Sequence, residues 1–423
     1  MKTDSIRMGV VACLLLLTGG AARAATFTVT SLADSSATGT LRWAITAANI
    51  SPPPNEIRFN VPSPFTILPT NALPFVTTTN LLINGASQPG FTGTPIVTLS
   101  GTNLFDAGAG LRLNGVNITV RGLRFTGFKP PSSAGISIFG NSNRVIACVA
   151  QSNDHGIAIS SPARAATIGG NAASNANTIT HNQGSGLHVT STGAQHVVSG
   201  NFIAFNDTGI HWQGRDGQIG GTTAAQRNII GGNTNVGIYL NQTTAHGNDL
   251  IGNYIGVDAT GTNAFGNGQI GIRMLAASNN VIGGESASER NIIAANGVYG
   301  IYANSALTRF NTIIGNYIGL NAAGQRMGNG WATSNGRGVM LENTPDNNLL
   351  LNVISGNIGH GILISGGTAT NNLLAGNLIG LEPSGTFAIS NNLNGVQIAS
   401  APGNLIGSAS LIFRNVISGN GQY

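Results

Sequence analysis

The feature that most limits how this chain can fold is internal repetition. A six-residue phrase, Asn-apolar-Ile-x-x-Asn, recurs at steps of 63, 61 and 63 residues. It begins at Asn228, Asn291, Asn352 and Asn415. A second marker, Gly-Ile-x-apolar or a close variant, falls twice in each unit, as at Gly271 and Gly300. One unit is therefore two turns of a regular structure, which is the signature of a solenoid.

Each turn contains three short apolar segments separated by Gly and Asn. In one turn they are residues 271–274, 280–283 and 291–294. Segments this short, with alternating apolar positions, are strands rather than helices. The sequence therefore predicts an all-β fold, a parallel β-helix of about twelve three-strand coils. Asn tolerates left-handed backbone at the corners, and we expect its amides to bond from coil to coil as a ladder.

Alternate coils carry insertions at one corner. These insertions are residues 258–267, 321–329 and 382–387. Because they leave the repeat at equivalent places, we expect them to project as loops on one side of the solenoid.

Residues 25–80 are expected to form an N-terminal cap of strand, amphipathic helix and strand. Residues 40–49 place Leu41, Ala44, Ile45 and Ala48 on one helical stripe, with Thr40 as N-cap. The β-helix is assigned to residues 81–423. The repeat predicts another Gly-Ile directly after Tyr423, so we expect further coils or a partner at that end.

Residues 1–24 read as a cleavable signal peptide. A charged start precedes the apolar run of residues 10–17, and an Ala-Arg-Ala site ends at Ala24. This predicts export to the periplasm, cell surface or medium, and no transmembrane segment is expected elsewhere.

The leader carries three basic residues and one acidic residue, so the mature chain keeps about +3 of the formal +5. That balance does not indicate nucleic acid as a partner. The remaining cysteine, Cys148, lies in an apolar segment and is predicted to be buried and inert.

Residues 40–49 and 55–59 resemble the N-terminal module of secreted bacterial proteins with a Cys-Ser-Leu-Arg-Glu-Ala signature. This chain departs from the signature at Gly39, Thr40 and Trp43. The repeated coils resemble right-handed parallel β-helix proteins, the broad pectate-lyase-like group. That group includes lyases, hydrolases, epimerases and non-catalytic surface proteins, so the resemblance implies the fold and leaves the activity open.

Hydrolases of that group pair a Gly-His-Gly-Ile segment with close aspartates. His360 and His155 stand before a Gly-Ile marker, but the residue at that place varies freely along the repeat. The sequence has no Asp-Asp or Asp-x-Asp pair to supply the acid and base of glycoside hydrolysis.

Lyases of the group have a different kind of site, in which several aspartates hold calcium. Here Asp154 and Asp207 occupy equivalent places two coils apart, with Gly184 between them, so no metal site is assigned.

One outward column of side chains is the main candidate for ligand binding. The x of successive Gly-Ile-x-apolar markers points away from the core. It reads His188, His211, Tyr239, Arg273 and Tyr302. Rings flanked by amides can bind sugars by stacking and hydrogen bonding, although the same column is also compatible with plain cross-strand pairing. Arg215 and Asp216 are expected near this face.

Two functions follow. The first is an exported, non-catalytic β-helix of surface, matrix or adhesin type that binds a polysaccharide; the uniform repeat and the 8% charged residues favour it. The alternative is a lyase, epimerase or hydrolase acting on an acidic glycan, with calcium as the only cofactor considered. Its candidate catalytic residues are Asp154, His155, Asp207, His211, Asp216 and Arg273.

Overall fold

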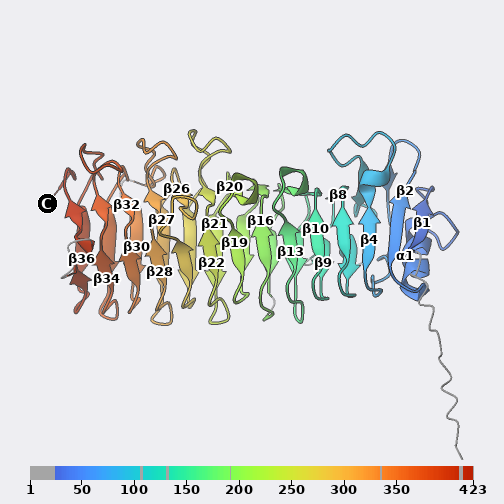
Figure 1. Cartoon of the computed structure of the whole chain (residues 1–423), viewed down its shortest axis with the longest axis horizontal. Helices are drawn as coiled ribbons and strands as arrows, with labels where there is room; N and C mark the ends of the chain where they lie inside the picture. Colours follow the sequence, from blue (N-terminus) through green and yellow to red (C-terminus); the bar gives the residue numbers. More distant parts are fainter. Residues whose placement is uncertain are drawn as a thin grey trace, which may run out of the picture.

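The computed structural model is a solenoid in which each regular coil passes through three parallel sheets (Figure 1). It describes residues 24–104, 108–129, 133–190, 192–333, 336–408 and 413–422. The expected leader therefore lies outside the described residues, apart from Ala24. The sheets, here called A, B and C, contain 14, 13 and 11 strands. The predicted parallel β-helix of three-strand coils is confirmed.

One central coil shows how the sequence builds this shape. It consists of β24 (Ile270–Leu275) in sheet C, β25 (Val281–Gly283) in sheet A and β26 (Ile292–Ile293) in sheet B. Ile272 and Ile293 point inward and are fully buried. Neighbouring coils repeat the arrangement in register, so the apolar side chains form one core along the solenoid.

Sheet C forms the face with the predicted column. Its strands are β6 (Leu111–Leu113), β9 (Ala134–Ile138), β12 (His155–Ile159), β15 (Ser185–Val189), β18 (Thr208–Trp212), β21 (Val236–Asn241), β24, β27 (Tyr299–Asn304), β30 (Arg337–Glu342), β33 (Ile362–Ser365) and β36 (Val396–Ala399).

Asparagine ladders run along all three corners. The Nδ2 of each Asn donates to the Oδ1 of its equivalent in the next coil, and that Oδ1 also accepts the backbone N–H of the preceding Asn. Between sheets A and B the ladder includes Asn253, Asn291 and Asn316, with amide-to-amide distances of 3.0 Å. A second ladder, between sheets B and C, runs from Asn153 to Asn420. The predicted corner ladder is confirmed, and it satisfies polar groups that are buried by stacking.

The three insertions leave the corner between sheets B and C, and they project along the upper edge of Figure 1. They cover an apolar outer face of sheet B that includes Tyr254 and Ile292. Two arginines that precede the repeated phrase brace this face. The guanidinium of Arg227 lies 4.0 Å from the Tyr254 ring, and that of Arg290 lies 4.1 Å from the Tyr317 ring.

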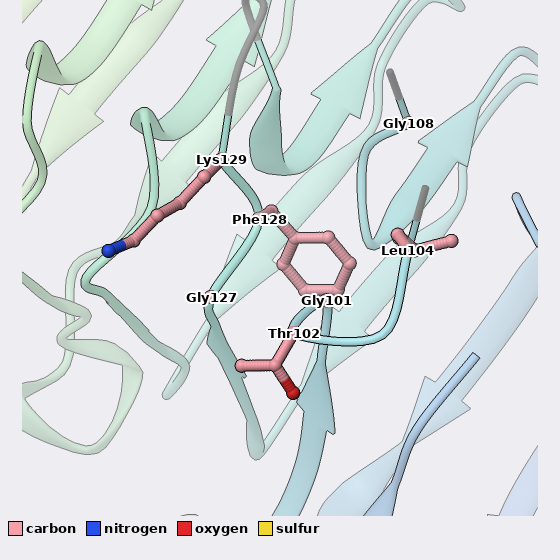
Figure 2. Close-up of a pocket in the computed structure, with 7 residues that line it drawn as sticks. All are labelled: Gly101, Thr102, Leu104, Gly108, Gly127, Phe128 and Lys129. Carbon is pink, nitrogen blue, oxygen red and sulfur yellow. The ribbon is translucent and has the colours of Figure 1, made fainter. Parts of the chain in front are cut away.

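The early, less regular coils leave a hollow of about 310 Å³ beside Phe128 (Figure 2). Its lining consists mainly of glycines and apolar side chains, with Lys129 at the rim. Among the described residues that line it, Thr102 carries the only hydroxyl and Lys129 is the only titratable group.

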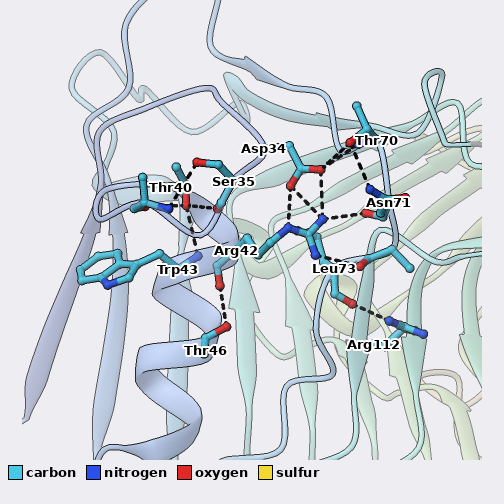
Figure 3. A network of polar contacts seen from close by, with 12 residues as sticks. Asp34, Ser35, Thr40, Arg42, Trp43, Thr46, Thr70, Asn71, Leu73 and Arg112 are labelled. Atoms are coloured by element: carbon cyan, nitrogen blue, oxygen red, sulfur yellow. Dashed lines mark hydrogen bonds and ion pairs between the residues drawn. The ribbon is translucent and has the colours of Figure 1, made fainter.

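The N-terminal end is covered by α1 (Leu41–Ile50), which packs against β1 (Ala25–Val29) and β2 (Asn55–Phe59). The Thr40 side chain caps the helix by accepting the N–H of Trp43, and the helix buries the predicted stripe. Arg42 binds the Asp34 carboxylate at 2.8 and 3.0 Å and donates to two loop carbonyls (Figure 3).

At the other end, inward-facing residues of the last coil are open to solvent. Ile406 is 38% exposed and Ile417 is 44% exposed. Cys148 is buried as predicted, and burial raises the pKa of its thiol to about 12. Among the described residues, no helix has the length and apolar character needed to cross a membrane.

Candidate active site on the outer face of sheet C

The predicted column exists in register on the outer face of sheet C. His188, His211, Tyr239, Arg273 and Tyr302 pair one after another through β15, β18, β21, β24 and β27. Each is half-buried, because its neighbours in the column shield it. Parallel pairing with one residue per coil places these side chains about 4.8 Å apart.

The rings of this column lie face to face. His188 and His211 stack with centroids 4.8 Å apart, and His211 and Tyr239 with centroids 5.2 Å apart. The Arg273 guanidinium carbon lies 4.9 Å from the centre of the Tyr239 ring. The ring faces therefore meet one another, and the ring edges are left to point away from the sheet. A ligand at this point meets ring nitrogens and phenol hydroxyls, so hydrogen bonding to edges is favoured over the stacking that the sequence suggested.

Hydrogen bonds select the tautomers of the histidines. Nδ1 of His155 accepts the Ser185 N–H at 3.0 Å, so Nε2 of His155 carries a proton and donates to Nδ1 of His188 at 2.8 Å. Nε2 of His211 lies 3.2 Å from the Asn241 amide nitrogen, which is a donor. The lone pair of His211 is therefore on Nε2. His155, which the sequence treated as a chance residue, belongs to this hydrogen-bonded row.

Burial keeps these histidines neutral. It lowers the pKa of His188 to about 3, and nearby His155 and His211 add to that effect. The pKa values of His155 and His211 are also lowered, again mainly by burial. At neutral pH the imidazole of His211 is neutral and its Nε2 can accept a proton, as a weaker base than an unshifted histidine.

Two arginines on this face have no acidic partner. The Arg273 guanidinium lies between the rings of Tyr239 and Tyr302. Arg337 donates to the Tyr299 hydroxyl at 3.2 Å. Within the described residues, neither arginine has a carboxylate within 4 Å, and neither Nε has a hydrogen-bond partner. The two Nε atoms are buried, so a carboxylate ligand would bind the terminal guanidinium nitrogens, whose charge no described carboxylate neutralises.

The far end of the column is closed by a tyrosine–glutamate pair. The Tyr302 hydroxyl donates to Glu342. Burial and this bond raise the pKa of Tyr302, so its hydroxyl stays protonated. Tyr302 is therefore less suited to proton transfer than Tyr239, whose hydroxyl makes no hydrogen bond among the described residues.

The acidic candidates are not brought together. Asp154 and Asp207 lie two coils apart, as the register predicted. The Asp207 carboxylate accepts from Asn235 and from the Thr208 hydroxyl. Asp216 pairs with Arg215 at 3.0 Å and lies beside Gly247 at the corner that leads to sheet A, with no contact to His211 among the described residues.

No trio of His, Cys, Asp or Glu in the described part of the chain is arranged to hold a metal ion. The described carboxylates also form no pair on sheet C that resembles the acid and base of a glycoside hydrolase.

Two residues of the site were missed from the sequence. Tyr299 and Arg337 precede Gly-Ile or Gly-Val markers, at a place treated as freely variable. In the structure they lie beside the column, with the Tyr299 and Tyr302 rings 5.0 Å apart. The signal was available, since a phenol and a guanidinium stand at this place in consecutive coils, where Ser185 and Thr208 stand in earlier ones.

Comparisons with known proteins agree with this architecture. A family model described as a right handed beta helix region matches residues 76–224. A search of curated protein sequences gives no significant match. Among solved structures, the chain is similar to the A-module of a mannuronan C-5 epimerase from Azotobacter vinelandii, with 14% identity over 90% of this chain and 94% of that one, and a TM-score of 0.58.

A periplasmic alginate epimerase is similar at 12% identity over 84% of this chain and 79% of its own, with a TM-score of 0.53. Likeness at such low identity shows the fold. The chain therefore has the right-handed parallel β-helix fold, and residues 76–224 match the family model of that fold.

Proposed function

We propose that this protein binds an acidic polysaccharide along the outer face of sheet C and cleaves it by β-elimination next to a uronate carboxylate. The substrate class is supported by the two unpaired guanidinium groups, Arg273 and Arg337, on a face with few acidic side chains. The structural relatives whose names specify mannuronan and alginate also act on polymers rich in carboxylates.

The observation that carries the proposed reaction is the stacking of His211 on Tyr239, with planes 12° apart. Because the two rings lie face to face, no sugar fits between them. Both must approach a bound sugar from the same side. Inversion at a carbon needs a proton removed from one face and returned to the other, whereas a syn elimination is completed by an acid and a base on one side. The geometry therefore favours a lyase over an epimerase.

The side chains then have defined roles. Arg273 binds the carboxylate and neutralises the charge that develops when the adjacent carbon loses its proton. His211 accepts that proton at Nε2. The electron pair forms a C=C bond as the bond to the glycosidic oxygen breaks, and the leaving oxygen takes the Tyr239 hydroxyl proton. The His211 imidazolium returns a proton to Tyr239. No acidic pair is required, which agrees with the scattered carboxylates.

The test is incubation of the purified protein with polygalacturonate, polymannuronate and polyguluronate, following the absorbance of the unsaturated product. Wild type is expected to cleave at least one of them. Arg273→Ala and His211→Ala should each lower kcat by about 100-fold or more. Arg164→Ala, which removes an exposed arginine from a corner, is the matched control and should leave the rate unchanged.

Other outcomes contradict the proposal. Deuterium uptake from heavy water into the polymer, with no unsaturated product, would indicate epimerisation and overturn the elimination step. Saturable binding of all three polymers with neither reaction would instead support a second candidate, an exported non-catalytic protein of surface or matrix type that binds polysaccharide. The separation of Asp154, Asp207 and Asp216 is the observation that favours this second candidate.

A further inference from the structure

One coil breaks the spacing that the others keep. In the coils from Asn153 to Asn391, the ladder Asn at the corner between sheets B and C is followed after three or four residues by the Gly of the next marker. From Asn329 to Gly338 the spacing is nine residues. A repeat that is otherwise uniform has therefore gained an insertion just before the strand that carries Arg337.

The insertion folds back over the preceding coil. Gly330 donates its N–H to the Asn296 carbonyl at 2.7 Å, and Ala332 donates to the Gly297 carbonyl at 2.8 Å. The indole Nε1 of Trp331 donates to the Ala295 carbonyl at 2.7 Å, yet the residue is 61% exposed. The ring is thus held by one edge while most of its surface faces solvent.

Trp331 extends a row of aromatic side chains along this corner. His181 and Phe205 occupy the corner position before the ladder Asn, and their rings stack with centroids 4.9 Å apart. In the next coils that position is Gly or Ala, and rings from the insertions lie over it. Phe265 covers Gly232 and meets Phe205 at 5.4 Å in an edge-to-face contact. We call the row of His181, Phe205, Phe265 and Trp331 the aromatic ridge.

Left-handed backbone is shared by the corners of this ladder, where Ser152, His181 and Ala295 also have positive φ, so the corner does not itself require an aromatic side chain. Phe205 has φ of +58°, a left-handed conformation that bulky residues rarely adopt. Equivalent corners of later coils use Gly232 and Gly356 without that cost. Phe205 also leaves 46% of its surface exposed, so burial in the core does not explain the choice of side chain.

A polar strip separates the ridge from the column on the same coils. The Asn235 amide donates to Asp207, and the Gln269 amide donates to the Asn235 Oδ1 at 2.9 Å. Crossing the surface, a ligand would meet aromatic rings, then amide and carboxylate groups, then the histidine, tyrosine and arginine edges. On the side of sheet C the ridge is bordered by these amides, and on the side of sheet B the Phe202 ring stacks on Phe265 with centroids 5.9 Å apart.

We propose that the aromatic ridge is a stacking platform for sugar rings of the polysaccharide, with Trp331 as its principal residue. This inference rests on the proposed function and adds the means by which a chain is held beside the column. A sugar presents a face of C–H groups that packs on the negative face of an aromatic ring, while its hydroxyls reach the amides of the polar strip. The ridge therefore binds sugar rings irrespective of their carboxylates.

The test uses Trp331 as its own reporter. Trp212 is fully buried and Trp43 lies in the N-terminal cap, so a ligand on the ridge should change chiefly the emission of Trp331. We expect titration with a polyuronate oligosaccharide, and with its carboxyl-reduced neutral form, to shift the emission of the wild type. The Kd of the neutral form should rise about tenfold in Trp331→Ala, measured by calorimetry, and stay unchanged in Arg273→Ala. Phe387→Ala removes a ring that is 73% exposed outside the ridge and should have no effect.

The outcomes separate the two proposals. If Trp331→Ala and Phe205→Ala bind the neutral oligosaccharide as tightly as wild type, the ridge proposal is wrong even when Arg273→Ala abolishes cleavage. If Trp331→Ala weakens binding while Arg273→Ala still cleaves at the wild-type rate, the proposed role of the ridge is supported and the proposed reaction is wrong. Self-association of the wild type that disappears in Trp331→Ala, without binding of either oligosaccharide, would overturn the ridge proposal in favour of a second copy of the chain.

Discussion

At one corner of the solenoid, His196 occupies the place that Asn143 and Asn248 hold in other coils. All three accept a backbone N–H from the neighbouring coil; for His196 the donor is Ala166, 3.1 Å from Nδ1. The imidazole is completely buried and its Nε2 has no partner among the described residues. Burial lowers the pKa of His196 to about 4. A single residue thus makes this corner sensitive to acid.

We expect His196 to cost stability as pH falls. An unfolded histidine titrates near 6.5, so between about 6.5 and 4 the unfolded state binds more protons than the folded state. The folded state is therefore favoured above pH 6.5 and loses up to about 3 kcal/mol as the pH falls to 4. His196→Asn restores the side chain used at equivalent corners and should flatten this dependence.

Hydrogen exchange of the strands beside His196, β13 (Thr167–Gly169) and β16 (Val197–Ser199), measures the local opening free energy at each pH. His181→Asn, at an exposed histidine, is the control. Equal pH dependence in His196→Asn and wild type would show that His196 does not titrate in this range.

At the residue scale, the sequence predicted which side chains face outward, but it did not predict how their rings are oriented toward one another. The order His188 to Tyr302 follows from the repeat, because register in a β-helix is set by the inward Ile of each marker. The rotation of each ring about its own side-chain bonds does not follow from the repeat. Stacking of His211 on Tyr239 and the bond from His155 to His188 therefore needed coordinates.

At the scale of elements, the asparagine ladders are what make the corners specific. Asn291 is fully buried and uses its whole side chain. Its Nδ2 donates to the carbonyl of Leu250 and to Asn316, and its Oδ1 accepts two N–H groups of Asn253. Apolar contacts alone would allow any small side chain at this corner. The four polar groups that bond to Asn291 are buried, however, and another side chain would leave them without partners.

Replacing Asn291 with alanine should therefore destabilise the molecule by about 3 kcal/mol or more, since several buried donors and acceptors lose their partners at once. Urea unfolding followed by circular dichroism gives the loss. Asn103→Ala, at an exposed turn, is expected to change stability by less than about 0.5 kcal/mol. A loss of equal size in both variants would mean that the ladder has no special energetic role.

The elements also show the limit of pattern reasoning. The strands could be predicted from the Gly-Ile marker and the Asn phrase because both recur in every unit. The helix α1 could be predicted because its buried residues follow the period of an α-helix. The aromatic ridge has no such period. Phe205 belongs to the repeat, whereas Phe265 and Trp331 come from insertions that fold back over different coils. Only the irregular spacing from Asn329 to Gly338 marked that region.

At the scale of the whole molecule, stability depends on how many neighbours each coil has. A coil cannot bury its own apolar residues, so its stability comes from contacts with the coils on either side. Ile282 and Ile406 point inward in the same column of sheet A, with three strands between them that contribute Ile313, Leu349 and Leu374. Ile282 is fully buried, whereas Ile406 is 38% exposed in the last described coil.

The same substitution should therefore have unequal effects at the two places. Ile282→Ala leaves a cavity between two packed coils and should cost about 3 to 4 kcal/mol. Ile406→Ala removes a side chain that already contacts solvent and should cost less than about 1 kcal/mol. Hydrogen exchange resolves the two cases, because Ile282→Ala should lower protection in β22 (Asp249–Ile251) and β28 (Thr312–Ile314), while Ile406→Ala should leave both unchanged. Loss of protection along the whole solenoid in both variants would show that the coils unfold as a single unit, and that stability is not the sum of neighbouring contacts.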